Sequence, residues 1–119
     1  MVGRISQVYE NFSKVMLISN KESSFNGEIQ EKEIEGIING KGNSKLYFEL
    51  LPKEKDIQGG ENVVTSPLGG IFPKGLLVGQ VKEVKKSDIE PFQQAEIKPA
   101  LDIQKLDFLF IIRTLDKNL

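Results

Sequence analysis

Short apolar runs separated by Gly, Pro, Asn and Asp recur along the chain, which is typical of an all-β protein with frequent turns. The segment KLYFELL at residues 45–51 shows the pattern most clearly, because Leu46, Phe48 and Leu50 alternate with Lys, Tyr and Glu. A period of two places alternate side chains on opposite faces of a strand. This segment is therefore predicted to be a half-buried strand with Leu50 on its apolar face.

The same reasoning predicts short strands throughout the sequence. The first two strands are joined closely enough to form an antiparallel hairpin. Residues 13–19 and 107–113 carry apolar side chains on both faces, so we expect both segments to be covered on both sides, with 107–113 central in the sheet. Residues 28–35 are expected to be extended, because the two isoleucines do not share a helical face. The predicted strands or extended segments are 2–9, 13–19, 28–35, 34–38, 45–51, 62–65, 76–84, 92–98 and 107–113.

The remaining segments are predicted to be connections. Residues 20–26 and 39–44 have loop and turn compositions, residues 65–75 form a long ordered loop, and residues 99–106 have room for one helical turn. Residues 114–119 are predicted to be a frayed end. Gly79 lies inside a strand, where glycine usually marks a bulge or a close backbone approach.

These elements predict one all-β domain over residues 1–119, a small antiparallel barrel or sandwich of about six to eight short strands. Closure would remove unpaired strand edges. A chain of 119 residues, 39% hydrophobic and 28% charged, is ordinary for a globular protein. With 16 basic and 17 acidic residues, the charge balance argues against a nucleic-acid partner.

Three missing residue types exclude most catalytic chemistry. The sequence contains no His, no Cys and no Trp, which rules out the usual zinc and iron–sulfur sites and the Ser-His-Asp and Cys-His catalytic arrangements. Only carboxylate, lysine or oxygen-ligand metal chemistry would remain, and we expect no cofactor. No apolar run approaches the length of a membrane span, and no signal-peptide h-region precedes the first strand.

Several motifs favour structural over chemical interpretations. The segment GIINGKG at residues 36–42 has three residues between its relevant glycines, whereas a phosphate loop needs four, so we predict a hairpin turn. Ser66 could be a nucleophile only with a lysine such as Lys74 or Lys41 as its base, and a structural loop is favoured. The acidic clusters at residues 31–35 and 88–90 are interpreted as solvated surface.

The glycine-rich loop also carries apolar residues, Leu68, Ile71 and Phe72. One interpretation is that they plug the end of a barrel. The other is that part of this apolar surface faces a partner. The plug is favoured.

Residues 62–84, NVVTSPLGGIFPKGLLVGQVKEV, resemble a stretch of the MreC family of cell-shape proteins of the form VVTSGLGGxFPxGLxIGxV. The resemblance extends over nearly the whole chain, through LLPKEKDIQGGENVV, FQQAEIKPA, the opening VGRI, SKVMLIS, and the segments at 34–40 and 106–112. Pro67 stands where the family usually has Gly. Either the turn differs there, or the position does not need a positive φ.

The resemblance implies a non-enzymatic scaffold for cell elongation. The family is bitopic, with one membrane helix, a coiled coil and an extracytoplasmic β-rich region that resembles two small barrels. This chain would be a fragment that holds only that region. Its expected location is extracytoplasmic, with the periplasm as the preferred compartment, and the full-length protein would be tethered to the inner membrane. The implied partners are the elongation transpeptidase (a penicillin-binding protein), MreD, the MreB filament system and further copies of itself.

We expect apolar side chains to serve as the partner contacts. The alternatives are a β-barrel module that binds glycan or oligonucleotide, or a hydrolase based on Ser66. Two Tyr and seven Phe with a net charge near zero argue against a base-stacking or phosphate-tracking groove. The candidate contact residues are Tyr9, Tyr47, Leu68, Ile71, Phe72 and Phe92.

Overall fold

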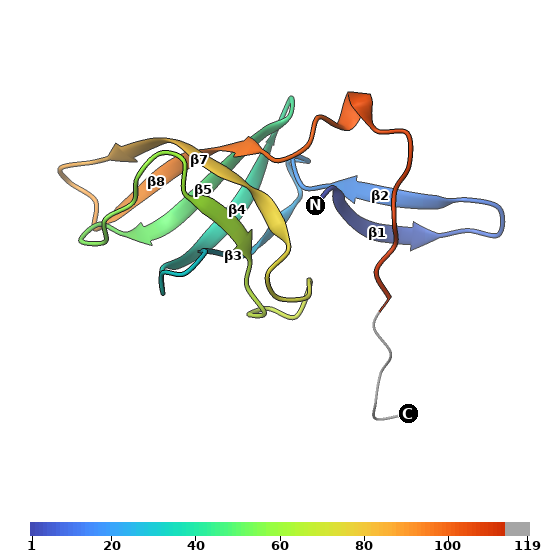
Figure 1. Ribbon diagram of the computed structural model, residues 1–119, viewed down its shortest axis with the longest axis horizontal. Helices are drawn as coiled ribbons and strands as arrows, with labels where there is room; N and C mark the ends of the chain where they lie inside the picture. Colours follow the sequence, from blue (N-terminus) through green and yellow to red (C-terminus); the bar gives the residue numbers. More distant parts are fainter. Residues whose placement is uncertain (114–119) are drawn as a thin grey trace.

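Eight antiparallel strands and one short 3₁₀ helix make up residues 1–113, which are the residues that the computed structural model describes. The all-β prediction is confirmed (Figure 1). The frayed end predicted for residues 114–119 lies outside the described residues. The elements are β1 (Gly3–Val8), β2 (Ser13–Leu17), β3 (Ser24–Ile29), β4 (Glu35–Gly42), β5 (Lys45–Pro52), β6 (Asn62–Thr65), β7 (Leu77–Lys86), β8 (Phe92–Pro99) and the 3₁₀ helix η1 (Ile103–Lys105).

Six of the strands close into a barrel in the order β3-β4-β5-β8-β7-β6. The closing contact is the antiparallel pairing of β3 with β6, in which Gly27 faces Thr65 and Ile29 faces Val63. Alternate side chains of each strand point inward and fill the barrel. The largest fully buried apolar side chains are Phe48, Ile29, Ile38, Leu46, Leu51, Val63 and Val78.

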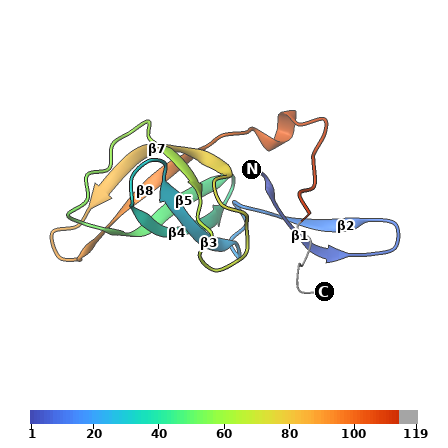
Figure 2. The same ribbon diagram turned by 60° about the horizontal axis from the view of Figure 1, so that its bottom comes forward.

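The β1–β2 hairpin projects from one end of the barrel (Figures 1 and 2). The predicted antiparallel pairing is confirmed, with Gly3 opposite Leu17 and Val8 opposite Ser13. The expectation that residues 13–19 are covered on both faces is wrong for β2. Its five residues are exposed or half-buried, and Val15 is 42% exposed, because β1 and β2 form a two-stranded sheet of their own and do not join the barrel.

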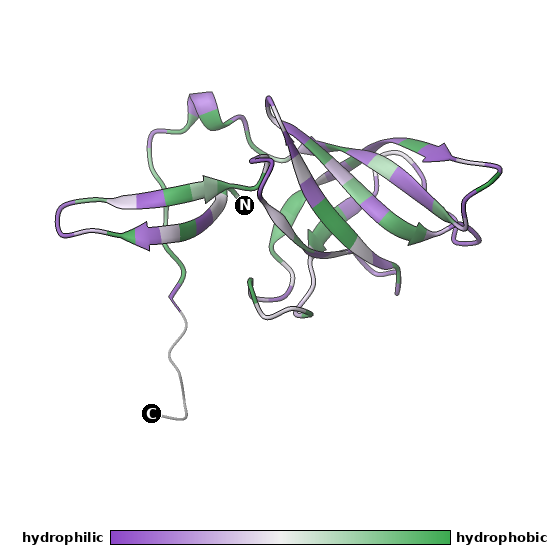
Figure 3. Cartoon of the chain, turned by 180° about the vertical axis from the view of Figure 1, so that it is seen from behind, coloured by the Kyte–Doolittle hydropathy of each residue, from purple (hydrophilic) through white to green (hydrophobic). Residues whose placement is uncertain are grey.

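The prediction of a central strand at residues 107–113 is also wrong. This apolar segment forms no helix or strand (Figure 3). Phe108 and Phe110 are 84% and 96% exposed. The physical reason is closure: β3 and β6 already pair with each other, so the barrel offers no free edge to another strand.

Polar composition at residues 20–26 and glycines at residues 39–44 hide two strand boundaries in the first half of the chain. The loop predicted for residues 20–26 ends earlier, because β3 begins at Ser24, and β4 runs to Gly42 through the predicted turn. The reversal lies instead at Asn43 and Ser44, with φ of 52° and 60°. Gly40 sits within β4 because a Cβ there would lie 2.1 Å from the carbonyl oxygen of Asn20.

A bulge in β5 reverses the expected orientation of Leu50. Phe48 pairs with Ala95 and Leu51 with Gln93, so two residues of β5 lie opposite one residue of β8. Phe48 and Leu51 both point inward and are fully buried, whereas Leu50 is 56% exposed with φ at 58°. The sequence pattern placed Leu50 on the buried face, and the bulge shifts that parity by one residue.

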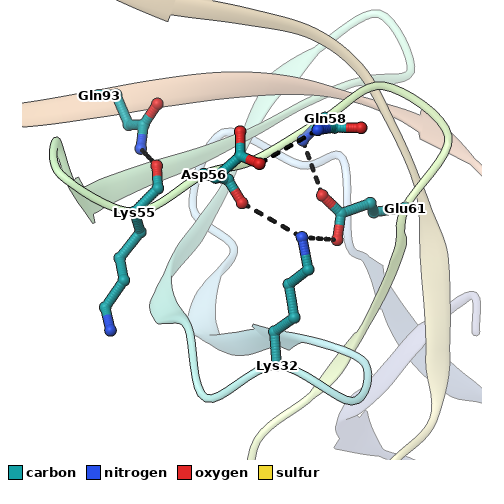
Figure 4. Close-up of polar contacts among 6 residues, drawn as sticks. All are labelled: Lys32, Lys55, Asp56, Gln58, Glu61 and Gln93. Carbon is teal, nitrogen blue, oxygen red and sulfur yellow. Dashed lines mark hydrogen bonds and ion pairs between the residues drawn. The ribbon is translucent and has the colours of Figure 1, made fainter.

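Loops close the two ends of the barrel. The β5–β6 loop inserts Ile57, which is 7% exposed, into the core. Lys32, in the turn between β3 and β4, fixes this loop through an ion pair to Glu61 (2.9 Å) and a hydrogen bond to the carbonyl of Asp56 (3.3 Å), as Figure 4 shows. The side-chain amide nitrogen of Gln93 donates to the carbonyl of Pro52, at the end of β5, and to that of Lys55 in the same loop.

Gly79 is the sharpest test of strand packing, because a Cβ at this position would lie 2.1 Å from the carbonyl oxygen of Lys98 on β8. We expect Gly79→Ala to lower the free energy of unfolding by roughly 1–3 kcal/mol through overpacking. Gly59→Ala is the matched control, since its Cβ would meet its nearest atom at 3.6 Å, and it should change stability by no more than about 1 kcal/mol. Urea unfolding followed by circular dichroism measures both. Equal stability of the two variants would contradict the register of β7 on β8.

The hairpin and the barrel should differ in local stability. A two-stranded hairpin is marginally stable by itself, whereas the barrel strands are buried on one face. We expect amide protons of β1 and β2 to exchange at least about a hundredfold faster than those of β4, β5 and β8. Hydrogen exchange followed by NMR measures this, and equal protection would show that the hairpin is covered in solution.

Candidate functional site

The β6–β7 loop, residues 66–76, is built on Thr65, which is fully buried at the end of β6. Its hydroxyl donates to the carbonyl of Pro73 (2.6 Å) and accepts from the amide of Leu76 (2.9 Å). The positive φ angles of the loop are at Gly69, Gly70 and Gly75. Position 67 therefore needs no positive φ, and this explains how proline fits there.

The three apolar residues of the loop lie in different environments. The ring of Phe72 packs edge-on against Phe25, with centroids 5.0 Å apart, and contacts the barrel core. Leu68 and Ile71 are 53% and 48% exposed on either side of the two tip glycines. Phe72 is thus the plug predicted for this end of the barrel, and Leu68 and Ile71 are surface residues.

Ser66 does not have the environment of a nucleophile. It is 2% exposed, and its hydroxyl accepts a hydrogen bond from the amide of Leu68 at 3.2 Å. A nucleophilic serine must reach substrate and needs a base within hydrogen-bond distance. The geometry at Ser66 is instead that of a loop-stabilising hydroxyl.

The other candidate contact residues lie on separate elements. Tyr9 stacks on Phe12 at the tip of the hairpin, with ring centroids 4.5 Å apart. Tyr47 is half-buried on the outer face of β5, with the Lys41 ammonium 5.9 Å from its ring centroid. Phe92 is 43% exposed at the start of β8. The structure therefore does not gather the six candidates into one patch.

Sequence reasoning missed a surface groove of about 340 Å³ at the end of the barrel where β5 and β7 end and β8 begins. Its apolar lining comes from Leu50 and Phe92. Lys85 and Lys86 line it from β7. The signal in the sequence was the Leu50–Leu51 doublet, which breaks the alternation of β5 and permits a bulge.

A second hollow, of about 430 Å³, lies where the hairpin meets the barrel and the segment that follows β8. Its lining is mainly apolar and includes Val2, Leu17, Leu101 and Ile103. Met1 also lines it.

Within residues 1–113 no group of three or more Asp and Glu side chains is placed to hold a metal ion. Over the same residues no helix has the length and apolarity that a membrane crossing requires.

Comparison with known proteins gives one consistent family. The model of the family "Rod shape-determining protein MreC, barrel core" matches residues 1–113. The cell shape-determining protein MreC of Cereibacter sphaeroides is 32% identical over 114 residues, which is 96% of this chain and 36% of the relative. The chain spans about a third of the length of the curated relatives it matches.

Solved structures agree in fold. A structure of MreC superposes with a TM-score of 0.83 at 26% identity, covering 88% of this chain and 60% of that one. The major periplasmic domain of the cell shape-determining filament MreC gives a TM-score of 0.71 at 30% identity, covering 86% and 65% of the two chains.

A further similar chain comes from a complex between a penicillin-binding protein and MreC of Helicobacter pylori, with a TM-score of 0.65 at 26% identity, covering 73% of this chain and 54% of that chain. The family model spans both the hairpin and the barrel, and the solved folds superpose on most of the chain. The chain therefore belongs to the MreC family of rod shape-determining proteins.

Proposed function

We propose that this chain is part of a non-enzymatic scaffold of the bacterial cell-elongation machinery, and that it binds a penicillin-binding protein that synthesises peptidoglycan. The observation that carries the proposal is its similarity to the chain solved in complex with a penicillin-binding protein. The scaffold helps to form and maintain cell shape by holding the synthase in place. MreD, the MreB system and further copies of the scaffold are its other partners.

The architecture suits a scaffold rather than an enzyme. The barrel is closed, its two ends are plugged by Ile57 and Phe72, and the loops that carry these plugs are held by hydrogen bonds. A partner therefore meets a surface that is already in its binding shape, which lowers the entropic cost of association. The candidate nucleophile Ser66 is buried, and its hydroxyl accepts a hydrogen bond from its own loop.

The hairpin and the apolar segment at residues 107–113 belong, in this proposal, to a second small β subdomain. The hairpin is exposed on both faces, and residues 108–112 are each more than half exposed although all are apolar. Such surfaces are normally covered by further structure. The placement we propose is extracytoplasmic and tethered to the inner membrane, supported by the similarity to the periplasmic domain of MreC.

Direct binding tests the proposal. We expect the chain to bind the purified extracytoplasmic part of the elongation penicillin-binding protein from the same bacterium, with a dissociation constant in the micromolar range typical of transient interfaces. Biolayer interferometry measures the affinity, and an unrelated β-barrel protein of similar charge is the control. Equal signals from both proteins would contradict the scaffold proposal.

Alanine variants at Phe72 and Leu68 compare a packed with an exposed position of the β6–β7 loop. We expect Phe72→Ala to lower the free energy of unfolding by roughly 2–3 kcal/mol, less than for a fully buried Phe because its ring is only partly covered. Leu68→Ala, at an exposed position, should change stability by less than about 0.5 kcal/mol. Urea unfolding measures both. At a temperature where Phe72→Ala is folded, its affinity for the penicillin-binding protein should be unchanged, and a loss of affinity without a loss of stability would make Phe72 a contact residue.

A further inference from the structure

Leu50 occupies a backbone conformation that its side chain does not favour. Its φ of 58° lies in the left-handed region, where Gly and Asn are tolerated and a branched apolar side chain is unusual. The bulge that creates this conformation lets Phe48 and Leu51 both enter the core. The fold requires the bulge, but it does not require leucine at the residue that the bulge turns outward.

The side chain of Leu50 gains little from the fold, since it is 56% exposed. It lines the groove of about 340 Å³ together with Phe92, which is 43% exposed and begins β8 opposite Pro52. Two large, exposed apolar side chains thus line the same groove, one of them at a conformational cost. Strained positions of this kind concentrate at binding sites.

The walls of the groove are fixed before any partner arrives. The β7–β8 connection is held to the end of β5 by a backbone hydrogen bond from Lys53 to Pro91 (3.2 Å) and by the Lys53 ammonium, which donates to the carbonyl of Ser87. The Ser87 hydroxyl accepts from the amides of Ile89 and Glu90 within that connection. The groove is therefore preformed.

The charges around the groove favour an acidic partner. Lys85 and Lys86 line it, and neither forms an ion pair within residues 1–113. Of the two lining carboxylates, Glu49 is already paired with Lys41 at 2.9 Å, which leaves Glu90 as the carboxylate without an ion pair in the described chain. Two available ammonium groups against one carboxylate give the lining of the groove a positive balance beside Leu50 and Phe92.

We propose that the penicillin-binding protein docks in this groove with an apolar side chain that contacts Leu50 and Phe92 and with flanking carboxylates that meet Lys85 and Lys86. This inference rests on the proposed function, and it assigns the contact to a residue that the fold exposes. The β6–β7 loop lies at the opposite end of the barrel, because one end of β6 leads into that loop and the other receives the β5–β6 loop.

Substitutions at Leu50 should lower the affinity for the partner without lowering the stability of the fold, whereas substitutions of a core residue lower stability. Leu50→Asn and Leu50→Gly keep the left-handed conformation and remove the anchor. We expect the melting temperature of Leu50→Asn to equal or exceed that of the unsubstituted chain, and the dissociation constant for the penicillin-binding protein to rise about tenfold or more in both variants. The variant Leu77→Ala, at a 44% exposed position where β7 begins at the far end of the barrel, is the matched control and should bind within about twofold of the unsubstituted chain.

The contribution of Lys85 and Lys86 to binding is measured through the association rate and its salt dependence. Lys85→Glu with Lys86→Glu should slow association and weaken its dependence on salt, because complementary charges act mainly on the association rate. Biolayer interferometry at low and physiological salt measures both rates, and circular dichroism measures the melting temperature.

The outcomes distinguish the two proposals. If the unsubstituted chain binds and Leu50→Asn binds equally well, or if the far-end control loses affinity instead, the groove assignment is overturned and the scaffold proposal stands. If Leu50→Asn loses its cooperative melting transition, Leu50 is structural and the groove assignment is again overturned. If the unsubstituted chain does not bind, the scaffold proposal itself fails.

Discussion

Closure of the barrel by the pairing of β3 with β6 is the constraint on which the rest of the structure depends. The contact is short, with three residue pairs between Gly27 and Thr65 at one end and Ile29 and Val63 at the other. It turns a curved sheet with two reactive edges into a surface with none. Partner strands cannot be added to the barrel, so recognition has to use outward side chains, bulges, loops or the separate hairpin.

Closure also explains why apolar residues are distributed as they are. The interior is filled by side chains such as Phe48 and Ile38, and the two ends are sealed by Ile57 and Phe72. Apolar residues beyond these positions have no room inside, and they appear on the hairpin, on residues 107–113, at the loop tip and at Leu50. In the proposed scaffold role, these exposed surfaces would be the ones that contact partners.

Side-chain bonds hold the two loops that lie at the ends of the barrel. Thr65 organises the β6–β7 loop through its hydroxyl, and Lys32 fastens the β5–β6 loop to the turn between β3 and β4. Exposed ion pairs of this kind contribute little individually. Their effect here is geometric, because they restrict loops that would otherwise move against the barrel ends.

The sequence by itself determined the all-β class, most strand positions and the family, because period-two alternation and turn residues are local signals and the motif at residues 62–84 is long. The absence of His and Cys in the sequence equally limited the available chemistry. Tertiary structure alone decided which strands close the barrel, and therefore that the apolar segment 107–113 lies outside it. It also decided the outward turn of Leu50, since a bulge depends on the register of a partner strand more than 40 residues away, which no local pattern records.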